Sequence, residues 1–138
     1  MILFNKYDHI ISKYVPLVAR LLIGLLFLMT GISKIMDIKL TQMDMSQMGL
    51  TYTGFFIVIA IIIELIGSLS IILGYATRFS ALTLSGYMIV LNLIFHLDPS
   101  QHVIFMLNWA IIGGLLLLFT YGPGPISFDA HNQNKSPN

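Results

Sequence analysis

The feature that most constrains this chain is a single carboxylate inside a long apolar segment. Residues 54 to 77 form a run of 24 residues in which Glu64 is the only side chain charged at neutral pH. A run of that length is typical of a transmembrane helix rather than of a helix in a soluble core. Glu64 falls near its middle, where an ionised carboxylate is costly unless it is protonated, hydrated or paired with a cation. The sequence therefore predicts a membrane protein in which another group compensates this charge.

The overall composition agrees with that class. Of the 138 residues, 57% are hydrophobic and only 9% are charged, which lies far outside the usage of soluble proteins. The formal net charge of +1 and the scattered basic residues argue against a nucleic-acid partner. The chain has no cysteine, so it cannot perform thiol–disulfide exchange or hold an iron–sulfur cluster through thiolates. A redox role would therefore need a cofactor or a partner.

The hydropathy pattern predicts an all-α fold, a transmembrane four-helix bundle formed by one membrane domain of residues 1–138. Pro16 suits the opening turn of the first span, and no small-x-small cleavage site follows, so this span is expected to be retained rather than removed as a signal peptide. The segment before it is expected to form a short interfacial helix. The polar tail, residues 123–138, is expected to be disordered at its end. The four spans are expected at residues 15–33, 54–77, 79–97 and 103–122.

One face of the first span carries two cations. Five residues recur at intervals of four, three, four and three, which places them on one narrow side of a helix. They are Arg20, Gly24, Phe27, Gly31 and Lys34. On an antiparallel neighbour, Glu64 would lie within about 8 Å of Arg20 along the helix axis. The sequence therefore predicts an ion pair between Arg20 and Glu64, with a purely architectural role as the alternative to a functional one.

The connection between the first two spans, residues 35–53, contains three closely spaced methionines. Thioethers at the spacing of Met43, Met45 and Met48 can hold Cu(I). The alternative is the apolar side of a short helix lying at the level of the lipid head groups. The absence of His and Cys from this segment favours the interfacial helix, so we expect no metal site here.

The third span also has a small, polar face. This face is expected to look inward, and it comprises Ala81, Ser85, Asn92 and His96. His96 is followed by Asp98 and His102, which suggests a proton relay or a metal pair. The alternative, favoured here, is a turn with ordinary interfacial histidines, because these three residues alone define no fixed geometry. In the fourth span, the amide of Asn108 is expected to link two helices.

The distribution of cations predicts the orientation. With four spans, both termini share one side, together with Lys6, Lys13, Arg78 and Lys135. Only Lys34 and Lys39 lie on the other side, so the termini are predicted to be cytoplasmic in a multi-pass protein of the cell membrane.

Several segments resemble one known family. Residues 20–34, RLLIGLLFLMTGISK, resemble the first-helix signature of the DoxX family of small four-helix membrane proteins. The resemblance extends from residue 15 to about residue 130, although Ser68 and Pro125 stand where many relatives carry glycine and a basic residue. Further matches are Met48-Gly49-Leu50, Glu64 with Gly67, LGYATR at 73–78, His96, and GPGPISFD at 122–129.

The resemblance implies a place in membrane redox systems, including quinone reduction with thiosulfate as donor and complexes that protect against oxidative stress. A quinone could accept hydrogen bonds from Arg20, Lys34 or His96, while Phe27 packs against its ring. In this hypothesis Glu64 handles a proton and Arg20 holds the anionic form of the carrier. Asn92 is a further candidate for ligand binding. The expected partners are membrane lipids and another membrane or peripheral redox protein, and a homo-oligomer is a further expectation.

Two alternatives belong to other classes. A non-catalytic scaffold or assembly factor would use the buried charges only to fix the register of its helices. A small-solute or proton pathway would reveal itself as uptake into vesicles that contain the purified protein alone. Substitution of Glu64 by Gln separates the redox subunit from the scaffold, because the scaffold would lose assembly and the redox subunit would lose activity.

Overall fold

The fold is entirely helical over the part of the chain that the structure describes. The computed structural model describes the backbone of residues 2–135 and the side chains of residues 7–134. This confirms the expected all-α class, including a short helix between the first two spans. The elements are α1 (Ile2–Met36), α2 (Ile38–Gln47), α3 (Thr53–Leu73), α4 (Thr77–Phe95), the 3₁₀ helix η1 (Pro99–Gln101), α5 (His102–Tyr121) and α6 (Phe128–Lys135).

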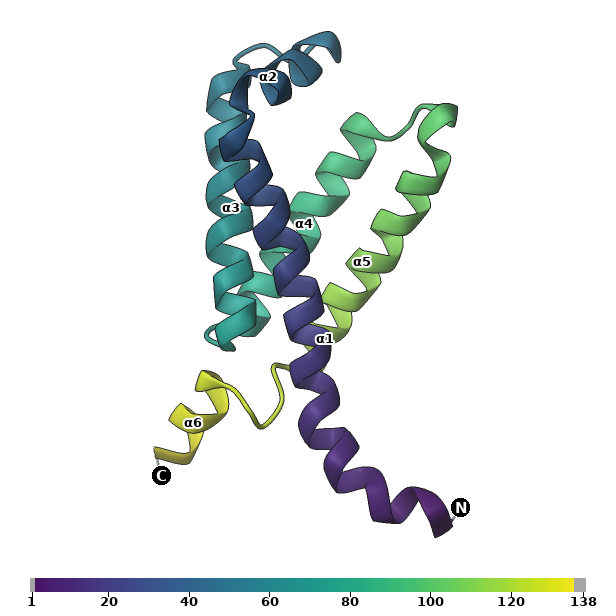
Figure 1. Cartoon of the computed structure of the whole chain (residues 1–138), viewed down its shortest axis with the longest axis vertical. Coiled ribbons are helices and arrows are strands. Elements are labelled where there is room, and N and C mark those ends of the chain that lie inside the picture. The colour runs from purple at the N-terminus through teal and green to yellow at the C-terminus, as the bar shows by residue number, and fades with distance from the viewer. Residues whose placement is uncertain (1, 136–138) are drawn as a thin grey trace.

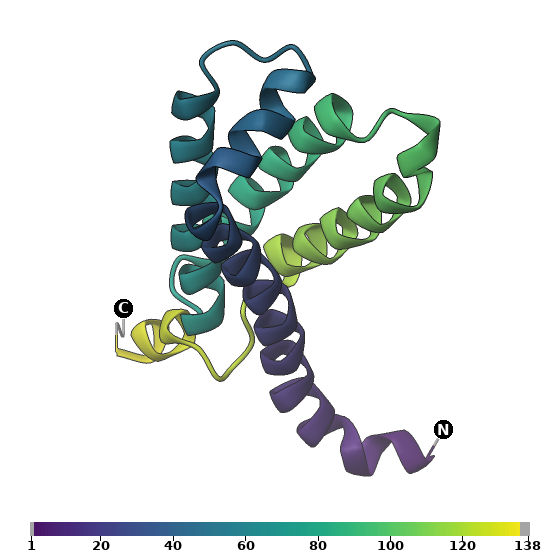
Figure 2. The ribbon, with the colours of Figure 1, turned by 45° about the horizontal axis from the view of Figure 1, so that its top comes forward.

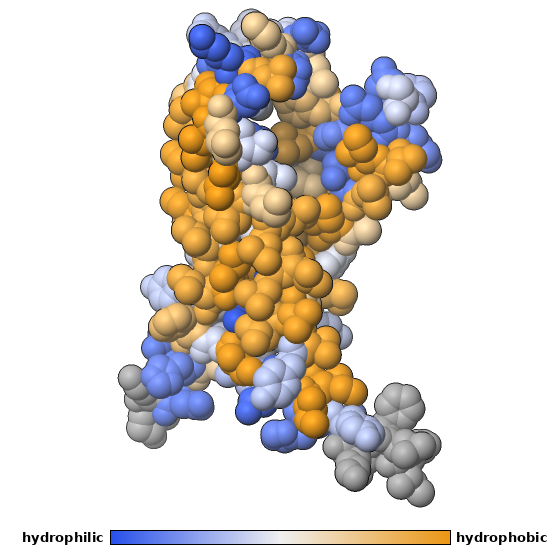
Figure 3. Space-filling view, in the orientation of Figure 1, coloured by the Kyte–Doolittle hydropathy of each residue, from blue (hydrophilic) through white to orange (hydrophobic). Residues whose placement is uncertain are grey.

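Four segments are long and apolar enough to cross a membrane. They correspond to residues 7–36 of α1, to α3, to α4 and to η1 with α5. In Figure 3 the apolar surface covers the middle of the molecule and polar residues gather toward both ends. This distribution is the one that a bilayer requires of a spanning bundle.

The helices form two pairs that diverge toward one end. Helix α1 packs mainly against α3, and α4 packs against α5. The two pairs meet near α6 and separate toward α2, so the molecule has the outline of a V that opens beside α2 (Figures 1 and 2). The described ends of the chain both lie at the end opposite α2 (Figure 1).

The first helix is longer than the sequence predicts. The expected span of 15–33 and the separate interfacial helix before it are replaced by one continuous helix, α1, which passes through Pro16. A proline inside a helix removes one backbone hydrogen bond and favours a bend. Figure 1 shows α1 curving away toward its N-terminal end.

Other boundaries differ from expectation in smaller ways. Helix α3 ends at Leu73 because Gly74 takes a left-handed conformation with a φ of 72°, so α4 already begins at Thr77. The polar tail contains α6, a short helix that the sequence analysis does not predict. The expected disorder at the end of the tail falls on residues 136–138, which lie outside the described residues.

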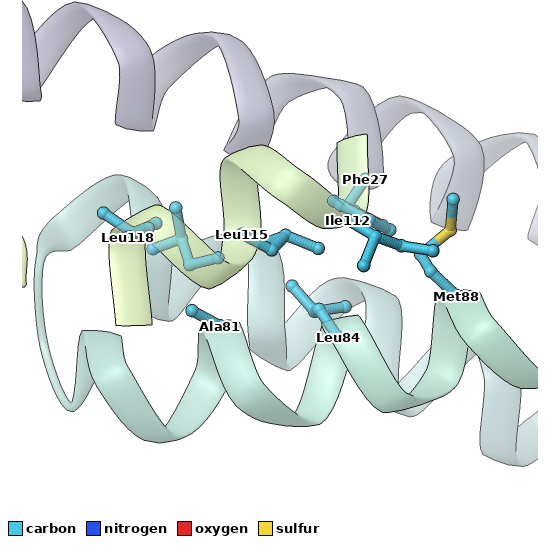
Figure 4. Close-up of a cluster of buried hydrophobic side chains, with 8 residues drawn as sticks. Phe27, Ala81, Leu84, Met88, Ile112, Leu115 and Leu118 are labelled. Carbon is cyan, nitrogen blue, oxygen red and sulfur yellow. The ribbon is translucent and has the colours of Figure 1, made fainter. Parts of the chain in front are cut away.

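The core fills the region where the two helix pairs meet. Its buried apolar side chains come from all four long helices and interdigitate (Figure 4). They are Phe27, Ile71, Ala81, Leu84, Met88, Ile112, Leu115 and Leu118. Glycines bring the helix backbones close together, since a Cβ on Gly24 would collide with Ile72 and a Cβ on Gly67 would lie 3.0 Å from Leu84.

This packing predicts different responses at two helical glycines. Gly24→Leu should lower the free energy of unfolding by about 1–3 kcal/mol, because the new side chain forces α1 and α3 apart. Gly113→Leu is the matched control, since a Cβ there meets no atom within 4 Å. The two variants are compared by unfolding in detergent micelles. Equal stabilities would contradict the described contact of α1 with α3.

Candidate functional site

The face of α1 predicted to carry two cations does point into the protein. Arg20, Gly24, Phe27 and Gly31 are buried, and Lys34 is partly buried. Their neighbours in the sequence are more exposed, as expected when one narrow side of a membrane helix packs against its partners. The prediction of a shared inward face is confirmed.

The partner predicted for Glu64 is wrong. Gly24 faces Ile72 and Gly31 faces Leu65. The two helices are therefore antiparallel, and the seven residues from Gly24 to Gly31 run alongside the seven residues from Ile72 back to Leu65. Along this register Glu64 lies opposite the last turns of α1, where Lys34 stands. Arg20 instead lies opposite the far end of α3. No ion pair of Arg20 with Glu64 occurs among the described side chains, and the salt bridge of Glu64 is with Lys34.

Glu64 is held by groups from two other helices. The ammonium group of Lys34 donates to both carboxylate oxygens, at 2.8 Å to Oε1 and 2.9 Å to Oε2. The hydroxyl of Tyr87 on α4 donates to Oε1 at 2.5 Å. These three hydrogen bonds, two of them from a cation, offset the cost of placing a carboxylate inside an apolar bundle. One carboxylate therefore connects α1, α3 and α4.

The two partners of the salt bridge differ in their access to the surroundings. The Glu64 side chain is 3% exposed and that of Lys34 is 20% exposed. Lys34 reaches Glu64 from the last turn of α1, so its aliphatic stem can lie along apolar surface while its charged end meets the carboxylate. Glu64 is thus buried behind a cation that lies closer to the polar end of the bundle.

Tyr87 was missed by the sequence analysis. It does not belong to the small, polar face of α4, and it lies on the side of that helix that meets α3. The available signal was chemical: a tyrosine inside an apolar span needs a hydrogen-bond partner for its hydroxyl. Glu64 on the preceding helix was the one acidic residue deep inside an apolar run of the sequence.

Arg20 serves a different part of the chain. Its guanidinium donates to the carbonyl oxygens of Pro123 and Ile126, both at 2.9 Å. These carbonyls belong to the segment that joins α5 to α6. Gly74 makes room for the guanidinium, since a Cβ at that position would lie 2.6 Å from Nη1 of Arg20. Arg20 therefore anchors the tail against α1 and α3.

The tail is also fixed to the start of α4. Asp129 of α6 accepts hydrogen bonds from the backbone N–H groups of Ala76 at 2.8 Å and Thr77 at 3.0 Å. Its own N–H donates to the carbonyl of Gly74 at 2.9 Å. A carboxylate at a helix N-terminus satisfies free N–H groups and interacts favourably with the helix dipole. The tail thus closes the end of the bundle that lies opposite α2.

A cavity of about 180 Å³ adjoins the buried salt bridge. It lies between α1, α3, α4 and α5, where the two helix pairs begin to separate. Phe27, Lys34, Glu64 and His96 all line it, so the structure brings together four of the six residues singled out in the sequence. Arg20 and Asn92 do not line it. Thr30 and Asn108 add further polar groups to its wall.

Asn92 does not line this cavity, but it is hydrogen-bonded to Asn108, which does. It is fully buried, and its Oδ1 accepts a hydrogen bond of 2.9 Å from Nδ2 of Asn108. Its own Nδ2 donates to the carbonyl of Phe105 at 3.2 Å. The prediction that Asn108 links two helices through its amide is confirmed, and this link positions Asn108 at the cavity wall.

The segment after α4 forms a tight turn. Asp98 caps η1 by accepting a hydrogen bond of 2.8 Å from the N–H of Ser100. Hydrogen bonds from the hydroxyl and the N–H of Ser100 lower the pKa of Asp98, so this carboxylate is ionised at neutral pH. His96 lines both the inner cavity and an outer hollow of about 380 Å³ that also contains Asp98 and His102. His96 therefore stands between the cavity and the end of the bundle.

Among the described residues, no group of three or more His, Cys, Asp or Glu side chains is close enough to hold an ion. Met45 of α2 is buried, whereas Met43 of the same helix and Met48 just after its end are exposed. The three thioethers therefore do not face one common point, and Met45 instead packs toward α3 and α4.

These features define a small integral membrane protein with four spanning helices and a buried, hydrogen-bonded charge cluster. The chain belongs to the DoxX family, whose model matches residues 15–97. It is 39% identical over 116 residues to the inner membrane protein YqjF of Escherichia coli, covering 82% of this chain and 88% of that protein.

Two further relatives extend the comparison. The chain is 30% identical over 122 residues to the inner membrane protein YphA of Escherichia coli, covering 82% of this chain and 86% of that protein. It is 34% identical over 86 residues to the Surfeit locus protein 4 homolog of Drosophila melanogaster, covering 53% of this chain and 32% of that protein. No solved structure matches the chain.

The geometry predicts that Glu64 is energetically coupled to Lys34 and not to Arg20. In a double-mutant cycle, Lys34→Met should cost about 3–5 kcal/mol of folding free energy because it leaves a buried carboxylate without its cation. The same change should cost much less in the Glu64→Gln background. A cycle of Arg20→Met with Glu64→Gln is the control and should be additive within about 0.5 kcal/mol. Coupling in the arginine cycle alone would contradict the described register.

Proposed function

We propose that this chain is the membrane subunit of a quinone-linked redox system and that it binds the head group of a quinone in the cavity beside Lys34 and Glu64. The observation that supports the proposal is the cavity itself. It combines a cation, a carboxylate and an imidazole with the apolar wall of Phe27, inside a membrane-spanning bundle. A quinone ring needs both hydrogen-bond donors for its oxygens and an apolar surface for its faces.

The cavity size limits what part of a ligand can enter. A volume of about 180 Å³ is below the roughly 300–1,000 Å³ of sites that enclose a drug-sized molecule. It suits a single small ring or a few water molecules. We therefore propose that only the head group occupies this cavity and that the rest of the carrier remains outside it.

Lys34 and Glu64 would have different roles in the reduction of a bound quinone. Lys34 would donate a hydrogen bond to a quinone oxygen. Full reduction of a quinone takes up two electrons and two protons. Both protons would come from water at the open end of the bundle, and the Glu64 carboxylate would take up one of these protons and pass it on to the same oxygen. The electrons would come from a partner redox protein, in the membrane or at its surface, because this chain has no thiol of its own. Arg20 takes no part, because its guanidinium is bonded to the tail.

A second candidate function is that of a scaffold or assembly factor. It is favoured by one observation: both oxygens of Glu64 already have donors within the protein, and these donors come from different helices. Such a cluster can fix the register of helices without any ligand. Substitution of Glu64 separates the two functions.

The decisive variant is Glu64→Gln, with Asp44→Asn on the exposed side of α2 as a matched change of carboxylate to amide. The protein is placed in nanodiscs and titrated with a tail-free benzoquinone, and quenching of Trp109, the only tryptophan, reports binding next to Asn108. We expect saturable quenching that weakens at least tenfold in Glu64→Gln and remains unchanged in Asp44→Asn.

The outcomes distinguish the two functions. Unchanged quinone binding by a folded Glu64→Gln variant would refute the proposed role of the carboxylate. No saturable binding by the natural sequence, together with loss of stability in Glu64→Gln, would favour the scaffold.

We further propose that both termini face the cytoplasm. The support is the excess of cations near the termini and the Arg78 turn, together with the position of both described chain ends at one end of the bundle (Figure 1). A fluorescent protein fused after residue 138 should fluoresce, and alkaline phosphatase at the same place should be inactive. Active phosphatase at the C-terminus would show the opposite orientation.

A further inference from the structure

A further hollow lies on the lipid-facing side of the cluster formed by Lys34, Glu64 and Tyr87. It is a groove of about 350 Å³ between α3 and α4, closed at one end by Met45 and Leu50 from α2 and the turn after it. Phe56, Val90 and Ile94 line it and are exposed on the surface of the membrane-spanning helices. The groove therefore opens toward the hydrocarbon of the bilayer rather than toward water.

The groove presents no free polar group. Only Thr83 and Tyr87 among its lining residues carry polar side-chain atoms. The hydroxyl of Thr83 donates to the carbonyl of Phe79 at 2.9 Å, and the hydroxyl of Tyr87 donates to Glu64. A head group would find no partner here, whereas a hydrocarbon chain needs none.

The groove and the polar cavity share a wall. Leu91 lines both of them. Tyr87 lines the groove while its hydroxyl bonds to Glu64, which lines the cavity. The lipid-facing groove and the polar cavity are therefore one layer of side chains apart, and at Leu91 a single side chain lies between them, so its displacement would join the two hollows.

From this shared wall we propose that the groove between α3 and α4 binds one hydrocarbon chain, the isoprenoid or alkyl tail of the carrier whose head group enters the Lys34–Glu64 cavity, with the Leu91 side chain displaced where the tail leaves the ring. This inference rests on the proposed function. From Thr83 to Phe95 the groove follows α4 for about 18 Å at the helical rise per residue. Met45, the buried residue of α2, closes the end of the groove with a flexible side chain that can adapt to the occupant.

Gly86 offers a direct way to fill the groove. It lines the groove, and a Cβ added there meets no atom within 4 Å. Gly86→Leu should occupy the space of the tail without disturbing the helix packing, and Gly86→Ala should have a smaller effect. Gly113→Leu on α5 is the matched control, because its added Cβ is equally free and it lines neither hollow. Thermal unfolding checks that all three variants are folded.

The experiment uses the full chain in quinone-free phosphatidylcholine nanodiscs, with Trp109 quenching as the readout. The probes are two benzoquinones with the same ring, one without a tail and one with a ten-carbon alkyl tail, compared at equal concentration in the bilayer. We expect the tail to tighten binding at least tenfold in the natural sequence and in Gly113→Leu. In Gly86→Leu that advantage should disappear while the affinity for the tail-free ring is unchanged.

The outcomes separate this inference from the function on which it rests. A tail advantage that survives in Gly86→Leu, with normal binding of the tail-free ring, would overturn the groove and leave the proposed function intact. Failure of the tail-free ring to bind at all would refute the proposed function. In that case, the tailed quinone could still bind through its tail alone. If decanol displaced it from the natural sequence but not from Gly86→Leu, the groove would be a site for bilayer lipid, and its assignment to a carrier tail would be wrong.

Discussion

The structure depends on how one carboxylate is accommodated inside an apolar bundle. Glu64 meets Lys34 from α1 and Tyr87 from α4, and these donors allow a charge to persist where the bilayer offers no solvation. Removing one partner of such a pair is far more costly than the net value of the pair, because the remaining charge stays buried. The cluster therefore acts together with the close contacts of Gly24 and Gly31 to select one axial position of α1 against α3. Hydropathy alone would allow many, since one apolar helix slides past another at little cost.

The two ends of the bundle are built differently, and this difference has functional meaning. At one end, Arg20 and Asp129 tie the tail across the start of α4, so that end is closed by hydrogen bonds between side chains and the backbone. At the other end, the helix pairs diverge (Figure 1). The cavity beside Lys34 lies between them, and His96 stands between that cavity and the surface. A ligand-binding role belongs at the open end. The proposed head-group cavity and tail groove both lie there, on opposite sides of the hydrogen bond between Glu64 and Tyr87.

Periodicity was sufficient to predict the faces of the helices but not their relative positions. The spacing from Arg20 to Lys34 correctly identified the inward side of α1, and the small residues of α4 did the same for that helix. The pairing failed because the axial offset was taken from an assumed membrane boundary near Val15, whereas α1 starts much earlier and runs to Met36. The role of Arg20 depends on tail carbonyls more than 100 residues away, which no local pattern reveals. Tyr87 escaped notice because a search for glycine and serine faces passes over an aromatic residue that packs by its ring and bonds by its hydroxyl.

Membership of the DoxX family and the four spanning helices establish what kind of protein this is, and the buried cluster supplies the chemistry for a carrier head group or for a rigid scaffold. Both depend on the same claim, that Lys34 compensates Glu64. Because Glu64 is the only glutamate in the chain, that claim can be measured at a single site. Solid-state NMR of protein in lipid, with ¹³C at the glutamate carboxyl and ¹⁵N at the lysine side chains, should show strong dipolar dephasing that disappears in Lys34→Met. The same experiment with ¹⁵N in the arginine guanidinium groups should show none. Dephasing by arginine and not by lysine would contradict the account.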